Sequence, residues 1–370
     1  MKRKKVMAVF GTRPEAVKMC PLIKELKKRG RFEACVCITG QHREMLDGVM
    51  SAFEVQAEYD LDVMKSGQTL FDVTSGVLTR TGEMLRADPP DVVLVHGDTA
   101  TAFAVSLACF YLGIPTAHVE AGLRTKDIHS PFPEEFNRRA IALTAAYHFA
   151  PTDNAAQNLL KEGVLPSRVF VTGNTVIDAL KYTLRDNYTH SLLEGTEGKK
   201  IIFLTAHRRE SLGEPLEEML KAVKLLAQSY SDVIFIYPVH PNPQVRGTAQ
   251  RVLGDCPQVR LCAPLGVLDC HNIMARSHIL LTDSGGLQEE GAALRKPVLI
   301  MRDTTERPEG LRAGIARLAG TDTDSVFLSV SSLLTTSTLY SQMSLAHNPY
   351  GDGNASARIA DILERELCQT

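Results

Sequence analysis

Short apolar runs rich in β-branched residues alternate with longer segments of helical period throughout the 370-residue chain. This alternation predicts parallel sheets, because two parallel strands need a long connection that is usually a helix. Each predicted set of strands has its own helices, so the pattern favours two doubly wound α/β domains over one large sheet. We expect strands at 5–10, 34–39, 92–96, 115–119, 147–150 and 169–171, and then at 200–204, 233–237, 259–261, 278–282 and 298–301.

The length of the chain and its apolar content of 44% suit two domains of roughly 170 to 190 residues, each with its own core. We expect the first domain at 1–174 and the second at 175–354, with a linking helix at 175–188. A last helix, at 355–368, is expected to pack back onto the first domain.

Composition excludes several classes of protein. A net charge of −2 provides no general attraction to nucleic acid or to an anionic membrane. The eight cysteines are scattered and form no CxxC pair, which is typical of small core residues in a reducing compartment. The apolar run after the basic start, 6–10, is shorter than the ~7–15 residues of a signal peptide, and no run approaches the ~20 residues of a membrane span. We therefore expect a cytoplasmic protein.

Four loops follow predicted strands and carry charge or glycine where a plain connector would not: 11–15, 96–99, 207–210 and 282–286. Parallel α/β sheets bind ligands at the carboxyl ends of their strands. These loops therefore predict an enzyme that acts on a phosphorylated or nucleotide-linked substrate.

Groups suited to a phosphate occur in both halves of the chain. Thr12 to Glu15 has the form of a capping box, and Arg13 beside this helix start suits an anion, with Lys18 one turn further on. The alternative is that Arg13 is simply solvated.

The Ser284-Gly285-Gly286 loop opens a predicted helix, so its backbone amides can approach a phosphate closely. Glu290, about one turn into this helix, can accept hydrogen bonds from ribose hydroxyls. Arg307 is a further candidate for anion binding. A structural turn with solvated charges is the alternative.

His207 comes directly before two arginines at a strand end, and like charges so close together favour a negative ligand such as a diphosphate. His240 also follows a strand, where a second ligand contact and a structural turn are equally good interpretations.

Carboxylates gather in the first half of the chain. Asp98 and Glu120 follow strands that can be neighbours, and Glu134 stands next to Glu135. Such a cluster suits proton removal and return, because mutual repulsion can raise one pKa toward neutrality. A metal site built from Asp98, Glu120, His96 and His118 is the weaker alternative, since no compact motif such as HExxH is present.

Together, these features predict acid–base chemistry on a sugar or similar group carried by a nucleotide diphosphate. No GxGxxG follows the first strand, which argues against a dinucleotide cofactor and hydride transfer. We expect no cofactor and no metal.

The chain resembles the non-hydrolysing UDP-N-acetylglucosamine 2-epimerases. The resemblance covers nearly the whole length through GTRPEAVKMCPLI, TGQHREMLD, HGDTATAFA, HVEAGLRT, PFPEEFNRR, TGNTVIDAL, TAHRRES, TDSGGLQEE and RDTTERPEG. It implies two Rossmann-like domains in the arrangement of the B-type glycosyltransferases, an active site in the cleft between them, and a homodimer. The implied reaction interconverts UDP-GlcNAc and UDP-ManNAc, by elimination of UDP to 2-acetamidoglucal and its re-addition, and supplies cell-surface polysaccharide.

The resemblance also implies a role for each candidate residue. It implies acid–base roles for Asp98, Glu120 and Glu134, and help at the diphosphate from His207. It implies UDP binding by Arg13, Lys18, Ser284, Gly285, Gly286, Glu290 and Arg307. A second UDP-GlcNAc site that activates the enzyme is implied at Gln41, His42, Gln68 and His240.

One segment departs from the family pattern, because Gly266, Val267 and Cys270 replace larger or polar residues near the expected uracil position. This departure predicts a looser base pocket. Three other functions remain as alternatives: a hydrolysing 2-epimerase that releases ManNAc and UDP, a glycosyltransferase of the same fold, and a non-enzymatic sensor of nucleotide sugars.

Overall fold

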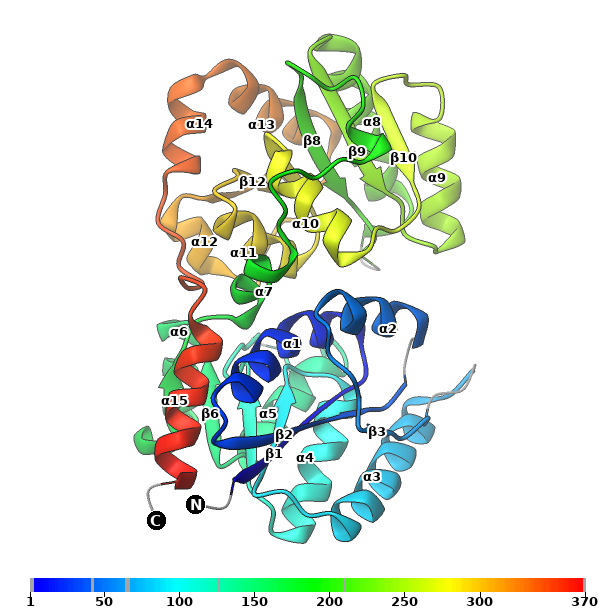
Figure 1. The fold of residues 1–370 in the computed structure, drawn as a ribbon. Coiled ribbons are helices and arrows are strands. Elements are labelled where there is room, and N and C mark those ends of the chain that lie inside the picture. The colour runs from blue at the N-terminus through cyan, green and yellow to red at the C-terminus, as the bar shows by residue number, and fades with distance from the viewer. Residues whose placement is uncertain (1–2, 41–42, 64–66, 126, 209–210, 369–370) are drawn as a thin grey trace. The chain divides into compact units, whose positions relative to one another are not determined.

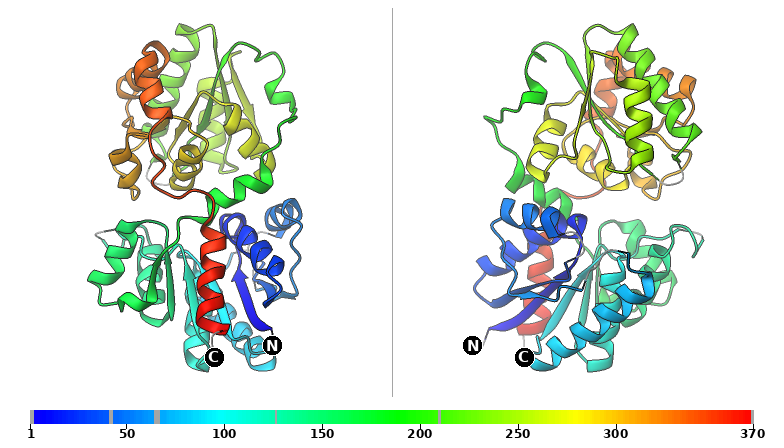
Figure 2. Two further views of the ribbon diagram at one scale, coloured as in Figure 1. Left: turned by 60° about the vertical axis from the view of Figure 1, so that its left-hand side comes forward. Right: turned by 90° about the vertical axis from the view of Figure 1, so that its right-hand side faces the viewer.

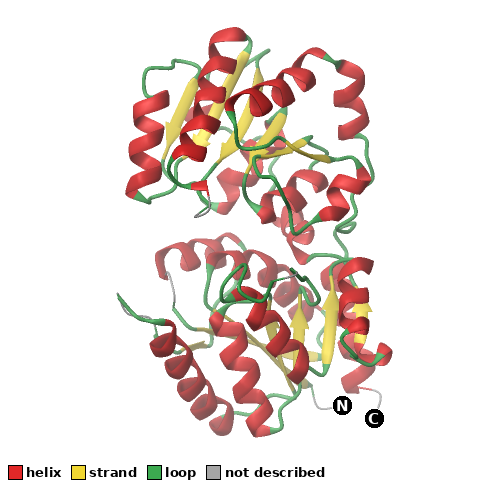
Figure 3. Ribbon diagram, turned by 180° about the vertical axis from the view of Figure 1, so that it is seen from behind, coloured by secondary structure: helices red, strands yellow, loops and turns green. Residues whose placement is uncertain are grey.

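The computed structural model describes residues 3–40, 43–63, 67–125, 127–208 and 211–368 (Figure 1). The chain forms two compact units: unit 1 comprises Met1–Tyr182 with Gly351–Thr370, and unit 2 comprises Thr183–Tyr350. In each unit, helices lie on both sides of the strands, as Figure 3 shows. No helix in the described part of the chain is both long and apolar enough to cross a membrane.

Unit 1 contains a seven-stranded parallel sheet in the order β3-β2-β1-β4-β5-β6-β7. The predicted strands of this half are present, with ends that differ by at most two residues. β3 was not predicted, because two residues are too short to produce a recognisable pattern. The strands are β1 (Lys4–Phe10), β2 (Phe32–Ile38), β3 (Tyr59–Asp60), β4 (Val92–His96), β5 (Thr116–Val119), β6 (Tyr147–Ala150) and β7 (Val169–Val171).

The helices of unit 1 are α1 (Arg13–Lys28), α2 (Arg43–Ala52), α3 (Leu70–Ala87), α4 (Ala100–Leu112), α5 (Glu134–Thr144), α6 (Asp153–Lys161), α7 (Thr175–Thr183) and α15 (Ala355–Cys368), and a 3₁₀ turn at Pro166–Arg168 precedes β7. The capping box predicted at Thr12 and Glu15 is present at the start of α1. α15 packs against α1, and Figure 2 shows it beside the N-terminal elements.

The division between the units falls near the end of α7, whereas the predicted division precedes it. The reason is a buried carboxylate. Asp178 of α7 accepts hydrogen bonds from the backbone N–H groups of Ala355 and Ser356 at the start of α15. This contact keeps α7 with unit 1. The predicted linking helix also ends at Thr183, earlier than expected.

Unit 2 contains a six-stranded parallel sheet in the order β10-β9-β8-β11-β12-β13. β13 was not predicted, because only three residues form it at the edge of the sheet and two of them are exposed. The strands are β8 (Lys200–Thr205), β9 (Val233–Pro238), β10 (Val259–Cys262), β11 (Ile279–Thr282), β12 (Val298–Ile300) and β13 (Ala316–Leu318). The helices are α8 (Glu214–Ser229), α9 (Pro243–Leu253), α10 (Val267–Arg276), α11 (Gly285–Ala293), α12 (Pro308–Ala313), α13 (Thr323–Thr335) and α14 (Ser337–Ser344), with a 3₁₀ turn at Ser191–Leu193.

The direction of strand order reverses between β1 and β4 in unit 1 and between β8 and β11 in unit 2. At such a switch point the two loops that leave neighbouring strands diverge, and the crevice between them is where these sheets bind ligands. The four charged or glycine-rich loops predicted from the sequence leave these four strands. The topology therefore brings the predicted loops together in pairs, one pair in each unit.

Candidate active site

The loop between β1 and α1 is held by a buried carboxylate. Glu15 Oε2 accepts hydrogen bonds from the backbone N–H groups of Gly11 and Thr12, at 3.1 and 2.8 Å, and Oε1 accepts one from the Thr99 hydroxyl at 2.8 Å. Burial raises the pKa of Glu15, and these hydrogen bonds oppose that effect. Glu15 therefore ties the first loop of the switch point to the start of α4. Arg13 lies half-buried at the N-terminus of α1, where the helix dipole favours an anion.

Glu120 is the centre of a cluster at the end of β5. Its Oε2 atom forms an ion pair with Lys18, accepts a hydrogen bond from Asn174 Nδ2 at 2.6 Å, and lies 3.8 Å from His96 Nε2. The Glu120 side chain is 7% exposed and the Lys18 side chain 10%. The sequence predicted Lys18 as a ligand of UDP; in the structure its ammonium group pairs with the carboxylate.

The backbone of Glu120 has a φ of +62°, in the left-handed region that residues with a Cβ rarely adopt. Such a conformation carries strain of about 1–3 kcal/mol and persists where its surroundings impose it, commonly at functional sites. The strained backbone and the contacts of Oε2 therefore give this carboxylate a fixed position.

Asn174 is a site residue that sequence reasoning missed. Its Oδ1 atom accepts a hydrogen bond from the Val176 backbone N–H at 3.1 Å, so the amide nitrogen is the atom that faces Glu120. Asn174 is 2% exposed. Its position could have revealed it. Asn174 lies in the loop after β7, just as the other candidate site residues lie in loops that follow strands.

Asp98 lies after β4 and is anchored by α5. Its Oδ2 atom pairs with the Arg138 guanidinium at 2.5 Å, and its backbone carbonyl accepts a hydrogen bond from Asn137 Nδ2 at 2.8 Å. Its side chain is 24% exposed, so the carboxylate remains accessible.

The adjacent carboxylates of α5 have different surroundings. Glu135 is fully buried, and it accepts hydrogen bonds from the Thr125 backbone N–H and from Arg139 Nε. Glu134 is half-buried in the first turn, and its side chain forms no hydrogen bond or ion pair with the rest of the described chain. Glu135 is thus a structural carboxylate, and Glu134 is available to a ligand.

The two histidines of the weaker metal alternative are buried and neutral. Burial lowers the pKa of His96 to about 4, although Glu120 nearby raises it, and burial lowers the pKa of His118 to about 3. His118 Nε2 lies 2.7 Å from the carbonyl oxygen of Gly97, within the framework of the loop. The described residues contain no group of three or more histidine, cysteine or acidic side chains arranged to hold a metal ion.

In unit 2, His207 and Arg208 follow β8 and lie beside Asp283, which follows β11. Asp283 Oδ2 accepts hydrogen bonds from the backbone N–H groups of His207 and Arg208, at 2.5 and 2.7 Å. The His207 ring stacks on that of His240, with ring centres 5.1 Å apart and an angle of 5° between the planes. The structure therefore brings together two histidines that the sequence predicted separately.

The Ser284-Gly285-Gly286 loop opens α11, and the Ser284 side chain makes no capping hydrogen bond. A Cβ at Gly285 would overlap the Arg307 guanidinium and the Glu306 carboxylate, so a larger residue there would have to displace these side-chain ends, whereas a Cβ at Gly286 would meet no atom within 4 Å. The loop is therefore packed on one side at Gly285 and open at Gly286.

Arg307 lies on the packed side of this loop and is 7% exposed. Its Nε atom pairs with Glu289 at 2.5 Å and its Nη1 atom with Glu306 at 3.0 Å. The sequence predicted Arg307 as an anion-binding residue; in the structure its charge also holds the loop together.

Glu306 connects three arginines. Burial alone would raise the pKa of Glu306, but the charges of Arg307, Arg208 and Arg302 lower it to about 2. The Glu306 carboxylate therefore stays ionised and links the loop after β8 to the loop after β12.

Glu306→Gln is expected to remove a pH-dependent part of the stability of unit 2. A pKa that falls from 4.5 in the unfolded chain to about 2 corresponds to about 3 kcal/mol. Because the folded state binds this proton more weakly, the contribution is complete above about pH 4.5 and is lost as the pH falls toward 2.

Urea unfolding of both proteins between about pH 3 and pH 7 tests this expectation, with Glu197→Gln, at an exposed glutamate of unit 2, as a control that changes little. A difference between the wild type and Glu306→Gln that is the same at every pH would contradict the assignment.

Glu290 lies in α11, where its Oε2 atom is 3.6 Å from His271 Nε2. His271 Nδ1 in turn lies 2.7 Å from the Thr183 hydroxyl. Glu290 is therefore held near the start of α10, the segment where the sequence predicted a looser base pocket. Gly266 and Val267 form the start of that helix, and Cys270 is half-buried in it.

The residues predicted for a second nucleotide-sugar site lie in different parts of the chain. Gln68, in unit 1, is half-buried and donates a hydrogen bond to the Val63 carbonyl. His240, in unit 2, is exposed apart from its stacked face. Gln41 and His42 lie outside the described residues.

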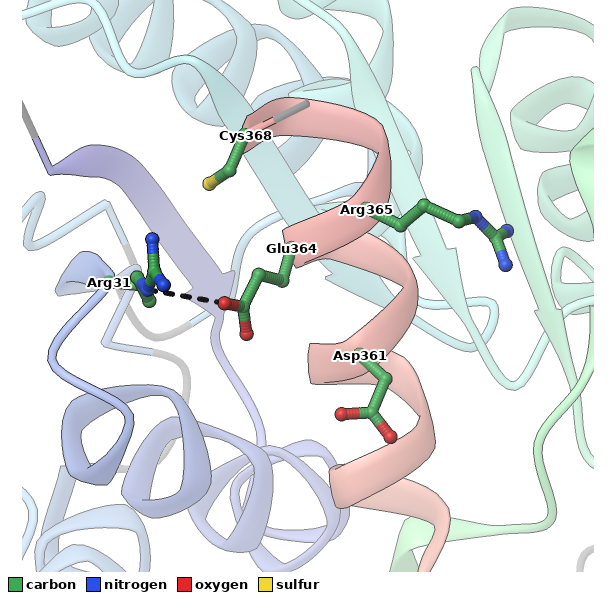
Figure 4. Close-up of a pocket in the computed structure, with 5 residues that line it drawn as sticks. All are labelled: Arg31, Asp361, Glu364, Arg365 and Cys368. Carbon is green, nitrogen blue, oxygen red and sulfur yellow. Dashed lines mark ion pairs between the residues drawn. The ribbon is translucent and has the colours of Figure 1, made fainter. Parts of the chain in front are cut away.

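A pocket of about 400 Å³ lies away from the switch point of unit 1, at the end of α15 (Figure 4). Arg31 pairs there with Glu364 at 3.3 Å, and Arg29 pairs with Asp361. The charged side chains that line the pocket are largely paired within the chain. This pocket therefore does not offer the acid–base and phosphate-binding groups of the candidate site.

The sequence profile of the family described as UDP-N-acetylglucosamine 2-epimerase matches residues 24–364. The chain is also 54% identical to the UDP-N-acetylglucosamine 2-epimerase of Bacillus subtilis (strain 168) over 363 residues, which cover 98% of this chain and 96% of that protein. The chain belongs to the UDP-N-acetylglucosamine 2-epimerase family.

Solved structures of similar proteins agree with this family assignment. The S. aureus MnaA–UDP co-structure has a TM-score of 0.94 and 49% identity, and the match covers 99% of this chain and 98% of that one. The UDP-GlcNAc 2-epimerase from Neisseria meningitidis, bound to UDP-GlcNAc, has a TM-score of 0.92 and 45% identity, with 98% and 100% covered. The predicted fold class, two Rossmann-like doubly wound units of the B-type glycosyltransferase kind, is confirmed for this member of the epimerase family.

Proposed function

We propose that this epimerase-family chain interconverts UDP-GlcNAc and UDP-ManNAc by inverting C2 of the sugar. The observation that carries the proposal is the set of carboxylates around the unit 1 switch point, with Asp98, Glu120 and Glu134 each held differently. Binding alone does not need such a set, whereas removing and returning a proton does. The product suggests a role in supplying ManNAc units for cell-surface polysaccharide.

The reaction proceeds by elimination and re-addition. The C1–O bond to UDP breaks, the C2 proton leaves to a carboxylate, and a C1=C2 double bond forms to give 2-acetamidoglucal. UDP then adds back at C1 while C2 receives a proton on the other face. Proton removal and return are redox-neutral, so the proposal invokes no redox cofactor.

Stabilisation of the departing diphosphate supplies a large share of catalysis, because the C2 proton is poorly acidic until positive character builds at C1. We assign this task to Arg13 and His207, and to the backbone amides at Gly285 and Gly286. Arg307 supports them from behind the glycine loop. Lys18, paired with Glu120, lies one helical turn from Arg13 and connects the phosphate-binding and acid–base groups.

Proton NMR of the purified protein with UDP-GlcNAc in D2O, without a nicotinamide cofactor, tests the proposed reaction. Deuterium at C2 together with UDP-ManNAc supports epimerisation through C2 proton exchange. Free ManNAc would point to the hydrolysing alternative, and no change at C2 would point to a glycosyltransferase or a sensor.

We also propose that UDP-GlcNAc activates the enzyme at a second site that includes Gln41, His42, Gln68 and His240. The basis is the match of these residues to the family motifs. The same NMR assay, run over a range of UDP-GlcNAc concentrations, tests this proposal. A sigmoidal rate curve supports it, and a hyperbolic curve contradicts it.

Finally, we propose that the protein is a homodimer formed through unit 1. Neighbouring helices α3, α4 and α5 of this unit carry large apolar side chains that are exposed in the single chain. They are Leu70, Phe71, Phe110, Tyr111, Phe136 and Leu143, of which Phe71 and Leu143 are each 87% exposed.

Phe110→Glu is expected to shift the sedimentation coefficient from that of a dimer toward that of a monomer, because a buried unpaired charge opposes association. Leu328→Glu, at a comparably exposed leucine of α13 in unit 2, is the control and should leave the dimer intact. A monomeric wild type would contradict the proposal.

A further inference from the structure

Asp283 is a buried carboxylate that the proposed mechanism does not use. It follows β11 at the unit 2 switch point and is 0% exposed. Its Oδ2 atom accepts hydrogen bonds from two successive backbone N–H groups, those of His207 and Arg208. These contacts fix the loop after β8, and they occupy only one of the two carboxylate oxygens.

The other oxygen faces the His207 ring. Asp283 Oδ1 lies 3.4 Å from His207 Nδ1, and it is buried with no hydrogen-bond partner in the described part of the chain. A buried carboxylate oxygen without a hydrogen-bond donor is unfavourable. An N–H group at His207 Nδ1 is therefore expected to form a hydrogen bond with Oδ1. The ring plane is already fixed by stacking on His240. His207 remains 37% exposed, so its surface is still open to a ligand.

We propose that Asp283 is a positioning residue for His207: its Oδ1 accepts the Nδ1 proton, so that Nε2 is the ring nitrogen presented to the diphosphate. This inference rests on the proposed function, which assigns His207 to the leaving group. When the ring is doubly protonated, Nε2–H donates to a phosphate oxygen, and the Asp283 charge stabilises the imidazolium behind it. A purely structural aspartate needs only its contacts through Oδ2.

Asp283→Asn separates these two roles. The asparagine carbonyl oxygen can still accept the two backbone hydrogen bonds, which leaves its NH₂ group facing His207 Nδ1. An NH₂ group donates, so Nδ1 must become an acceptor and the proton of the neutral ring must move to Nε2. The substitution therefore preserves the loop and reverses the tautomer.

Nitrogen-15 NMR of histidine-labelled protein reads the tautomer directly, without substrate, at the alkaline end of a pH series, where the ring signals no longer change with pH. The His207 signals are assigned by their loss in His207→Gln. We expect a proton on Nδ1 in the wild type and on Nε2 in Asp283→Asn. A proton on Nε2 in the wild type would overturn the inference without any variant, and so would an unchanged tautomer in a folded Asp283→Asn.

Kinetics provide a second measurement. Asp283→Asn is expected to lower kcat by about 100-fold, with KM for UDP-GlcNAc changed less than about threefold, the pattern of a lost transition-state interaction. Asp322→Asn is the control, since Asp322 also accepts a backbone N–H, at the exposed start of α13, and forms no hydrogen bond or ion pair with a described histidine. An unchanged kcat in Asp283→Asn would contradict the inference. A wild type that is inactive in D2O would contradict the proposed function, and the tautomer measurement would still decide the role of Asp283.

Discussion

Asp98→Asn, Glu120→Gln and Glu134→Gln are each expected to lower turnover by at least about 100-fold while UDP still binds. Each substitution keeps the shape of the side chain and removes its ability to exchange a proton. The effect on Glu120 has a particularly clear basis, because Lys18 and Asn174 both approach its Oε2 atom and a neutral amide would lose the ion pair. Steady-state rates and calorimetric titration with UDP measure the two properties separately.

Glu135→Gln is the matched control for the adjacent Glu134. Glu135 is fully buried and holds Arg138, Arg139 and the Thr125 backbone, so its replacement should lower the melting temperature and reduce turnover less than Glu134→Gln does. Rates near that of the wild type in all three carboxylate variants would defeat the proposed mechanism.

Gly122→Ala is expected to lower the free energy of unfolding of unit 1 by about 3 kcal/mol, because two unfavourable effects add. Gly122 has a φ of +88°, where an alanine is strained by about 1–2 kcal/mol. A Cβ at this position would also overlap the carbonyl oxygen of Ala155, a backbone atom that cannot rotate away. Gly122 lies two residues after Glu120, so the variant should lose activity as well.

Gly113→Ala distinguishes the two effects. Gly113 has a φ of +69°, but a Cβ there would meet no atom within 4 Å, so only the backbone strain of about 1–2 kcal/mol is expected. Urea denaturation of both variants measures the difference. Equal losses of stability would show that the contact between the added Cβ and the Ala155 carbonyl oxygen does not lower the free energy of unfolding.

The strands of both sheets were predicted well from the sequence, because a strand is recognised by its local periodicity. Strands such as β1 and β8 are continuous apolar runs bounded by polar loops, and each differs from the prediction by one residue at one end. β3 and β13 were missed because they are short edge strands. The positions of the four strand-end loops also followed from the alternation of elements, since a parallel sheet places all of its carboxyl ends at one edge.

The side-chain partners could not be predicted in the same way. Lys18 and Glu120 are 102 residues apart in the sequence, and Asn174 reaches Glu120 across 54 residues. No local period encodes such pairings, because they depend on how strands are ordered in the sheet. The same reason applies to Arg307, which precedes α12 and whose buried partner Glu289 lies in α11. A sequence identifies chemical groups at a site more readily than the contacts that fix their orientation.

The position of α15 has a consequence for how the protein is made. Ile359, Ala360 and Leu363 of this helix are buried in unit 1, although the ribosome adds them only after all of unit 2 has been synthesised. Unit 2 can therefore fold as soon as it emerges, whereas unit 1 waits with an uncovered apolar surface until the last helix arrives. The unit whose synthesis starts first is completed last, so premature termination of translation would spare unit 2 and leave unit 1 exposed to aggregation and proteolysis.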